Sequence, residues 1–299
     1  MFRNDKNKSK EGHISVLNNL FNIKNNVIYI ITNKQILKTK DLRIIIFRFF
    51  STVWTKAFSN RLPINSAIKH QRKLSGYDLA ISFHQEQKKK TVLSGFSRVV
   101  DRCIEAKKKV AWLHYDCKQS NLDSDYNEPF YKKMDVIMCV SKSLAEGCKE
   151  VFPSVREKVD YCYNFINYDE LVEKSKLPQT IEYEDGKFIC YSACRLAEVK
   201  AIPRAIHAFS EIFKSHPDLM WYIAGDGPEK DVIESVIYQY GLEGQIILLG
   251  NQSNPYSYMR NADLVMNVSY HEAAPMIYLE AKALGVPVFA TKTASSEEV

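Results

Sequence analysis

A regular alternation of two kinds of segment in residues 187–291 constrains the fold more than any other feature of this sequence. Short runs rich in apolar and aromatic residues predict strands, and longer segments with apolar residues at three-to-four spacing predict helices. The predicted strands are 187–194, 219–225, 245–250, 263–269 and 286–291, and the predicted helices are 202–216, 228–241, 254–261 and 275–285. This alternation is typical of a parallel sheet with both faces covered.

The first half of the chain is less regular but also has strand-like runs. They are 25–32, 77–83, 109–116, 134–141 and 158–164. The polar, proline-containing segment 165–187 reads as a connection between two lobes. We therefore expect an α/β protein with an N-terminal Rossmann-like lobe (1–170) and a C-terminal Rossmann-like lobe (171–299). In this arrangement the carboxyl ends of both parallel sheets would face a cleft that binds ligands.

Composition and cysteine usage exclude several classes of protein. The chain has 299 residues, 45% of them hydrophobic, which is enough for two cores. Seven cysteines without a C-x-x-C pair indicate neither a disulfide framework nor a zinc site. Residues 1–20 lack the apolar core of a secretory signal, and the apolar run 44–50 is too short to span a membrane. We expect a cytoplasmic protein that acts either in the cytoplasm or at the inner face of the membrane.

Charge divides the chain unevenly. Residues 1–110 carry 23 Lys or Arg and 7 Asp or Glu, a balance of +16, whereas the whole chain carries +6, so the remainder is near −10. A basic lobe suits nucleic acid, anionic lipid or phosphorylated substrates, and the absence of a recognisable nucleic-acid motif argues against the first. The aromatic and basic stretch 41–63 fits either peripheral contact with an anionic membrane or packing within the first lobe.

Polar and small residues follow the strands of the second half, where a parallel sheet binds ligands. The run CRLAEVKAIPRAIHAF places Arg195 and Lys200 five positions apart, IAGDGP follows the next strand, and Glu272 and Glu280 flank the start of the last helix. These motifs, in this order, closely resemble the donor-binding half of glycosyltransferase family 4. The resemblance extends from about residue 77 to the C-terminus.

The resemblance implies the glycosyltransferase-B fold and a retaining transfer of a hexose from a nucleotide diphosphate sugar, of UDP or GDP type, with no cofactor or metal. The acceptor would be a glycan or a lipid-linked molecule, in surface polysaccharide synthesis. Retention is often attributed in this family to attack on the face the leaving phosphate departs from, with that phosphate taking the acceptor proton. Nucleic acid is not an expected partner.

Physical chemistry assigns donor-binding roles to the same residues. Arg195 and Lys200 can neutralise the diphosphate as it leaves. Pro275 suits the first helical position, so the free amides of Met276 and Ile277 can bind phosphate. The two glutamates need a separate assignment because both can accept hydrogen bonds from sugars. Glu272 would reach the hydroxyls of the transferred sugar and Glu280 the ribose diol, the roles that the family also assigns. Taken alone, either pair could consist of surface charges.

Two residues of the first lobe complete the predicted site. His114 follows the strand KKKVAWL and matches the family position where a histidine faces donor sugar and acceptor, so we expect a catalytic role in orienting groups or handling a proton. Ser141 follows the strand MDVIMC and is a weaker candidate on the acceptor side. A structural histidine is the alternative for His114.

Some features depart from the family. Residues 1–24 show no clear opening strand with a glycine-rich turn, Ala273 stands where glycine is usual, and the chain stops at 299 before further elements that the family normally has. We therefore expect an incomplete C-terminal lobe.

The alternatives to an active transferase are a non-catalytic subunit that binds a partner transferase or a glycan, and, less well supported, a sugar-binding protein of the periplasmic type. The G-D-G-P turn lacks the third glycine of a dinucleotide fingerprint, which argues against a nicotinamide cofactor.

Overall fold

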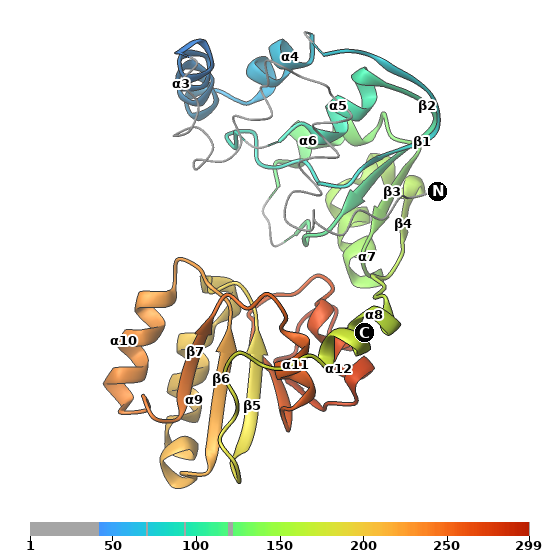
Figure 1. The fold of residues 1–299 in the computed structure, drawn as a ribbon. Coiled ribbons are helices and arrows are strands. Elements are labelled where there is room, and N and C mark those ends of the chain that lie inside the picture. The colour runs from blue at the N-terminus through green and yellow to red at the C-terminus, as the bar shows by residue number, and fades with distance from the viewer. Residues whose placement is uncertain (1–41, 70, 93, 119–121, 299) are drawn as a thin grey trace. The chain divides into compact units, whose positions relative to one another are not determined.

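The computed structural model describes residues 42–69, 71–92, 94–118 and 122–298, with side chains from residue 49 onward. The predicted strand at 25–32 lies outside the described residues. The chain divides into two compact units, the first made of residues up to 138 together with 147–160, and the second of 139–146 together with 161–299. The expected lobe boundary at 170/171 lies ten residues beyond the last transition. Each unit is an α/β structure (Figure 1).

The first unit is built on a four-stranded parallel sheet in the order β1-β2-β3-β4. Its elements are α3 (Leu42–Ala57), α4 (Arg61–Lys69), β1 (Leu74–Ser82), α5 (Phe96–Cys103), β2 (Ile104–Leu113), α6 (Ser124–Tyr131), β3 (Val136–Cys139) and β4 (Val159–Tyr161). Helix α7 (Lys142–Val151) is shared, since its residues up to 146 belong to the second unit and those from 147 to the first. Leu113, Ile137 and Phe152 are fully buried in its core.

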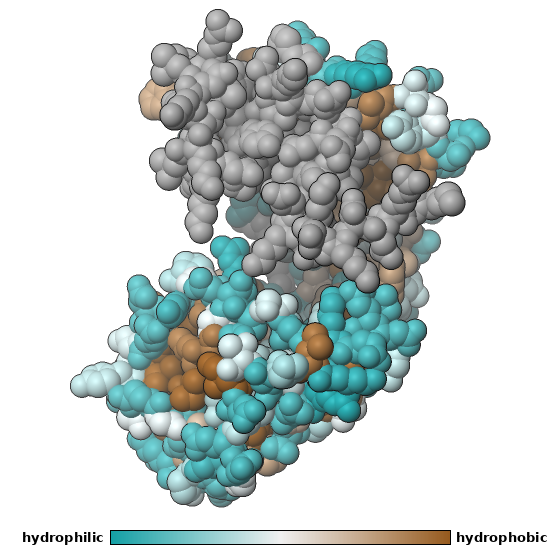
Figure 2. Space-filling model, in the orientation of Figure 1, coloured by the Kyte–Doolittle hydropathy of each residue, from teal (hydrophilic) through white to brown (hydrophobic). Residues whose placement is uncertain are grey.

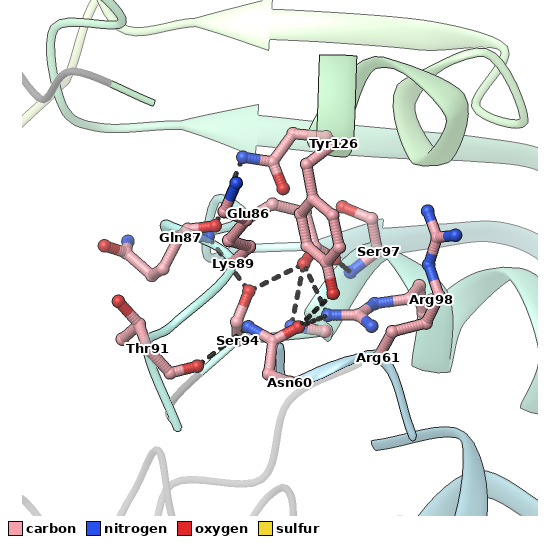
Figure 3. A network of polar contacts seen from close by, with 12 residues as sticks. Asn60, Arg61, Glu86, Gln87, Lys89, Thr91, Ser94, Ser97, Arg98 and Tyr126 are labelled. Atoms are coloured by element: carbon pink, nitrogen blue, oxygen red, sulfur yellow. Dashed lines mark hydrogen bonds and ion pairs between the residues drawn. The ribbon is translucent and has the colours of Figure 1, made fainter. Parts of the chain in front are cut away.

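A buried polar network fixes the loop between β1 and α5 (Figure 3). The carboxylate of Glu86 accepts hydrogen bonds from the amides of Gly95 (2.8 Å) and Ser97 (3.1 Å) at the start of α5. The same carboxylate pairs with the guanidinium of Arg98 at 3.3 Å, and both side chains are almost fully buried. Because a buried charge is costly without a partner, this network specifies how the loop folds.

The second unit has a five-stranded parallel sheet in the order β7-β6-β5-β8-β9. Its elements are α8 (Tyr168–Ser175), β5 (Phe188–Ala193), α9 (Ile202–Ser215), β6 (Leu219–Ala224), α10 (Lys230–Tyr240), β7 (Ile246–Gly250), α11 (Tyr256–Arg260), β8 (Leu264–Asn267), α12 (Met276–Leu284) and β9 (Val288–Ala290). Helices pack on both faces: Trp221 and Ile206 lie in one cluster, and Tyr191 and Ala281 in the other.

Every strand and helix predicted for residues 187–291 is present, and each end lies within two residues of its predicted position. The segment 165–187, expected as a connection, contains a helix that was not predicted, α8. The side chain of Asn167 caps this helix by accepting from the amide of Glu170, and Lys174 pairs with Glu170 one turn later. The sequence N-Y-D-E carries this capping signal, which a polar composition concealed.

The surface of the second unit is mostly hydrophilic on the face shown in Figure 2, with hydrophobic side chains gathered where Figure 1 draws β7 and α10. No helix in the described ranges is both long and apolar enough to cross a membrane.

Candidate functional site

The strand order of the second unit creates one point where a ligand can enter. From β5 the chain adds β6 and β7 on one side and then returns to add β8 on the other. The loops after β5 and β8 therefore diverge and leave a crevice at the carboxyl ends of the strands. A pocket of about 270 Å³ lies there. Its lining includes Ser192, Cys194, Lys200, Asn267, Ser269, Glu272, Pro275, Met276, Ile277 and Glu280.

An ion pair stands in this pocket. The Nζ of Lys200 lies 2.6 Å from Oε1 of Glu272, and the two side chains are 23% and 12% exposed. The hydroxyl of Ser269 lies 2.6 Å from the same carboxylate oxygen and 2.8 Å from Oδ1 of Asn267. The pocket thus combines a cation, a carboxylate and a hydroxyl, a set that can recognise a polar, anionic ligand.

The loop that carries Glu272 is fixed by several contacts. Arg204 donates to the carbonyl of Val268 (2.7 Å) and stacks on the ring of Tyr270, with its Cζ 4.1 Å from the ring centroid. The amide of Tyr270 donates to the carbonyl of Val199 (2.9 Å), beside Lys200. These bonds join the loop after β8 to the loop after β5, so the ion pair has a rigid support.

The start of α12 forms another wall of the pocket. The predicted position of Pro275 is corrected by one residue: it is the N-cap, with φ −69° and ψ 116°, and Met276 is the first helical residue. The helical amides of Met276 and Ile277 have no carbonyl one turn earlier in the helix to bond to, so they remain donors for an anion. Ala273 has no left-handed backbone, since Ala201 is the one non-glycine residue with positive φ in the described part of the chain.

Glu280 lies one turn deeper along α12 and also lines the pocket. Burial raises the pKa of its carboxyl, while the hydrogen bond from the Tyr256 hydroxyl (3.3 Å) acts in the opposite direction. Tyr256 begins α11. The short helix after β7 therefore supplies a donor to the glutamate, a contact that the sequence did not predict.

The G-D-G-P turn has a structural explanation. A Cβ atom on Gly225 would lie 1.7 Å from the carbonyl oxygen of Cys194, and one on Gly227 would lie 2.1 Å from that of Leu196. Asp226 accepts from the amide of Gly227 (2.8 Å), which closes the turn. Both glycines permit the loop after β6 to approach the backbone of the loop after β5.

The structure therefore brings together five of the predicted donor-site residues: Lys200, Glu272, Met276, Ile277 and Glu280. Arg195 is different. It follows β5 as predicted, but its side chain is exposed and does not line the pocket. Asn267 and Ser269 are pocket residues that sequence reasoning missed, although both follow a predicted strand in the same way as Glu272.

His114 lies in the first unit and Ser141 in the second. In the first unit His114 follows β2, its Nε2 is buried without a partner, and its ring lies 4.5 Å from that of Phe83. Burial and the nearby His84 lower the pKa of His114. In the second unit the Ser141 hydroxyl accepts from the amide of Leu144 (3.3 Å) at the start of α7, which is a capping contact. A role of Ser141 on the acceptor side stays a prediction.

The described ranges contain no group of three or more His, Cys, Asp or Glu side chains arranged to hold a metal ion.

Comparison with known proteins gives an independent result. Residues 173–299 match the sequence profile of a family described as glycosyl transferases group 1. An uncharacterized glycosyltransferase of Methanocaldococcus jannaschii is 27% identical over 165 residues, which are 54% of this chain and 41% of that protein. The chain spans less than half the length of the curated relatives it matches first.

Solved structures match the fold. A glycosyltransferase from Rickettsia africae aligns with a TM-score of 0.57 and 16% identity, over 85% of this chain and 64% of that one. The pneumococcal O-GlcNAc transferase GtfA, solved with UDP and GlcNAc, aligns with a TM-score of 0.54 and 19% identity, over 74% of this chain and 43% of that one. These likenesses establish the glycosyltransferase-B type of α/β fold with two parallel sheets.

Proposed function

Residues 173–299 match the glycosyl transferases group 1 family, and on this premise we propose that the chain is a retaining hexosyltransferase that uses a nucleotide diphosphate sugar. The observation that carries the proposal is the convergence of Lys200, Glu272, Glu280 and the first amides of α12 on one pocket at the switch point of the sheet. UDP is the first nucleotide to test, because a solved structure of this fold holds it. The acceptor is a glycan or a lipid-linked molecule, and the place of action is the cytoplasmic face of the membrane.

Each part of the pocket has a role that follows from its chemistry. The diphosphate lies against the amides of Met276 and Ile277 and the ammonium of Lys200, which stabilise the negative charge that grows on it as the glycosidic bond breaks. No metal is needed for this neutralisation in the proposed mechanism. Glu280 accepts hydrogen bonds from the ribose diol, and Tyr256 orients it.

Glu272 and Lys200 act together in the proposed site. They form an ion pair at 2.6 Å. A bound diphosphate would share the lysine, and Glu272 would then accept from hydroxyls of the hexose. The sugar is thereby oriented with its reacting carbon toward the acceptor. The acceptor hydroxyl forms the new bond, the bond to the diphosphate breaks, and the proton passes to the leaving phosphate, as the family resemblance suggests. His114 orients the acceptor or handles this proton in the assembled enzyme.

Binding and turnover test the proposal separately. UDP should raise the melting temperature of the full chain, and Glu280→Gln should abolish most of that rise. Release of free hexose from a panel of UDP- and GDP-sugars then identifies the donor. Binding of UDP without hydrolysis or transfer of any donor would favour the non-catalytic alternative, and absence of UDP or GDP binding would overturn the donor site.

A further inference from the structure

From residue 49 onward, helix α3 presents its large apolar side chains to solvent and its small polar side chains to the protein. Among its described side chains, Ser51 and Thr55 are buried, whereas the large apolar ones are exposed. The exposed residues on α3 and directly after it are Phe49, Phe50, Val53, Trp54 and Phe58, with exposed fractions of 43–65%. We call these five residues the aromatic face. A soluble helix normally shows the opposite arrangement.

The aromatic face is continuous. At 100° per residue its members occupy about half of the helix circumference, from Phe49 to Phe58, and the buried Ser51 and Thr55 lie on the other half. Phe49 packs edge-on against Phe50 at 5.7 Å, and Trp54 against Phe58 at 4.6 Å between ring centroids. The side chains thus form one apolar surface.

The first unit holds this face outward through Asn60, which follows α3 and is fully buried. Its Oδ1 accepts from the Tyr126 hydroxyl (2.6 Å) and from Arg98 (2.9 Å), and its Nδ2 donates to the carbonyl of Thr91 (2.7 Å) (Figure 3). Arg61 lies over the ring of Tyr126 at 5.1 Å. The buried network around Glu86 and Arg98 therefore also fixes the connection from α3 to α4.

The sequence from α3 to the residues after α4 carries charge of one sign. Residues 42–77 contain no Asp or Glu and seven basic residues: Arg43, Arg48, Lys56, Arg61, Lys69, Arg72 and Lys73. Lys56 is exposed beside the aromatic face, and Arg61, Lys69, Arg72 and Lys73 are exposed on α4 and after it. An aromatic apolar face on a basic segment complements a surface with an apolar interior and anionic headgroups.

We propose that the aromatic face of α3 docks the protein onto an anionic lipid membrane, with the helix lying in the plane of the interface. The phenylalanines enter the acyl boundary, Trp54 occupies the headgroup level, and Lys56 and Arg61 contact the headgroups. The proposal deepens the proposed function, since it supplies a reason for a lipid-linked acceptor. Only this link to the acceptor rests on the proposed function; the docking itself does not.

Vesicle binding by the full chain tests the docking. We expect co-sedimentation with vesicles of phosphatidylcholine and phosphatidylglycerol, weaker binding to phosphatidylcholine alone, and a blue shift of tryptophan emission that Trp54→Phe removes. The double substitution Phe50→Ser with Phe58→Ser should weaken binding by about tenfold or more. Tyr238→Ser on α10, where the side chain is 76% exposed, is the matched control and should bind as the wild type does.

Charge reversal separates the electrostatic part. Lys56→Glu should weaken binding to anionic vesicles several-fold and flatten its salt dependence, whereas Lys214→Glu on the second unit should not. Equal binding by the double serine variant and the wild type would overturn the proposal. The proposal would also be overturned if the full chain formed dimers and the double serine variant were monomeric, because the aromatic face would then pack against a second copy of the chain. If the wild-type chain binds UDP but does not bind anionic vesicles, the docking alone is refuted. If it binds the vesicles but neither UDP nor GDP, the donor site alone is refuted.

Discussion

Lys200 and Glu272 approach to 2.6 Å in the pocket of the second unit, although 72 positions separate them in the chain. The lysine comes from the loop after β5 and the glutamate from the loop after β8, the two loops that diverge at the switch point. In the proposed donor site these are the two charges that a diphosphate sugar would engage, so they would exchange partners when it binds.

The two members of this pair should respond differently to substitution. Lys200→Met removes the cation, so UDP affinity should fall by about 10- to 100-fold, the effect of one charge-assisted hydrogen bond. Glu272→Gln removes the competitor of the diphosphate, so UDP affinity should stay within about threefold of wild type or rise while transfer is lost. Titration calorimetry with UDP measures both, with Lys214→Met as the control. Equal losses of UDP affinity in the two variants would contradict the assignment.

The ionised carboxylate of Glu280 should lower the free energy of unfolding. Because burial raises its pKa in the folded state, folding favours the protonated form, and the contribution of the group to stability falls as pH rises from the ordinary value through the raised one. Glu280→Gln should therefore raise the melting temperature at pH 7 by about 2–4 °C, the shift that roughly 1 kcal/mol gives. The gain should vanish below about pH 4, where an ordinary glutamate is protonated. A variant that melts lower at pH 7 would contradict this account.

Gly225 should tolerate no side chain. In Gly225→Ala the new Cβ would lie 1.7 Å from the carbonyl oxygen of Cys194, at a φ of 141°, so either the loop after β5 or the loop after β6 must move. We expect a loss of at least about 2 kcal/mol in the free energy of unfolding, measured by urea denaturation. Gly244→Ala is the control, since its Cβ would have no atom within 4 Å. Similar stability of both variants would refute the close approach.

The sequence predicted most of the second unit because its strands are buried on both faces and read as apolar runs, and its helices have one apolar face each. It failed at α8, where Tyr168–Ser175 is polar and the signal lies in the cap of Asn167 and the Glu170–Lys174 pair. In the first unit the basic and aromatic α3 could not be assigned, because its apolar residues point outward and its buried ones are Ser51 and Thr55.

The site was predictable where a motif has fixed spacing. Glu272 and Glu280 fall on one helix and the loop before it, so their common pocket follows from local geometry. The contacts of Tyr256 with Glu280 and of Ser269 with Glu272 depend on strand order and loop conformation, which the spacing of residues does not encode. Arg195 shows the converse: its position after β5 was correct, but the direction of an exposed side chain is not set by its neighbours in sequence.

The Glu86–Arg98 pair should be a stability determinant of the first unit. Glu86→Ala would leave the guanidinium of Arg98 buried without a carboxylate and the amides of Gly95 and Ser97 without an acceptor. The expected loss is about 3–5 kcal/mol in the free energy of unfolding. Removal of an exposed partner in Asp78→Ala, whose pair with Lys107 is more than 80% solvent-exposed on the aspartate side, should cost less than about 1 kcal/mol. Comparable losses of unfolding free energy in the two variants would show that the network in Figure 3 does not stabilise the first unit more than an exposed ion pair does.

The last prediction concerns His114 and the acid limb of the transfer reaction. Burial and the neighbouring His84 lower the pKa of His114, so its imidazole stays neutral to a lower pH than a free histidine. If His114 handles the proton as proposed, that role should persist at this lower pH. His84→Ala removes both some burial and the second charge, so the pKa of His114 should rise toward 6.5 and kcat should begin to fall at a higher pH. His114→Ala should lower kcat by about 100-fold or more without a comparable change in UDP affinity. His216→Ala, on an exposed histidine after α9, is the control and should leave the pH profile unchanged. An acid limb that does not move in His84→Ala would remove His114 from the reaction and leave it a structural residue at the end of β2.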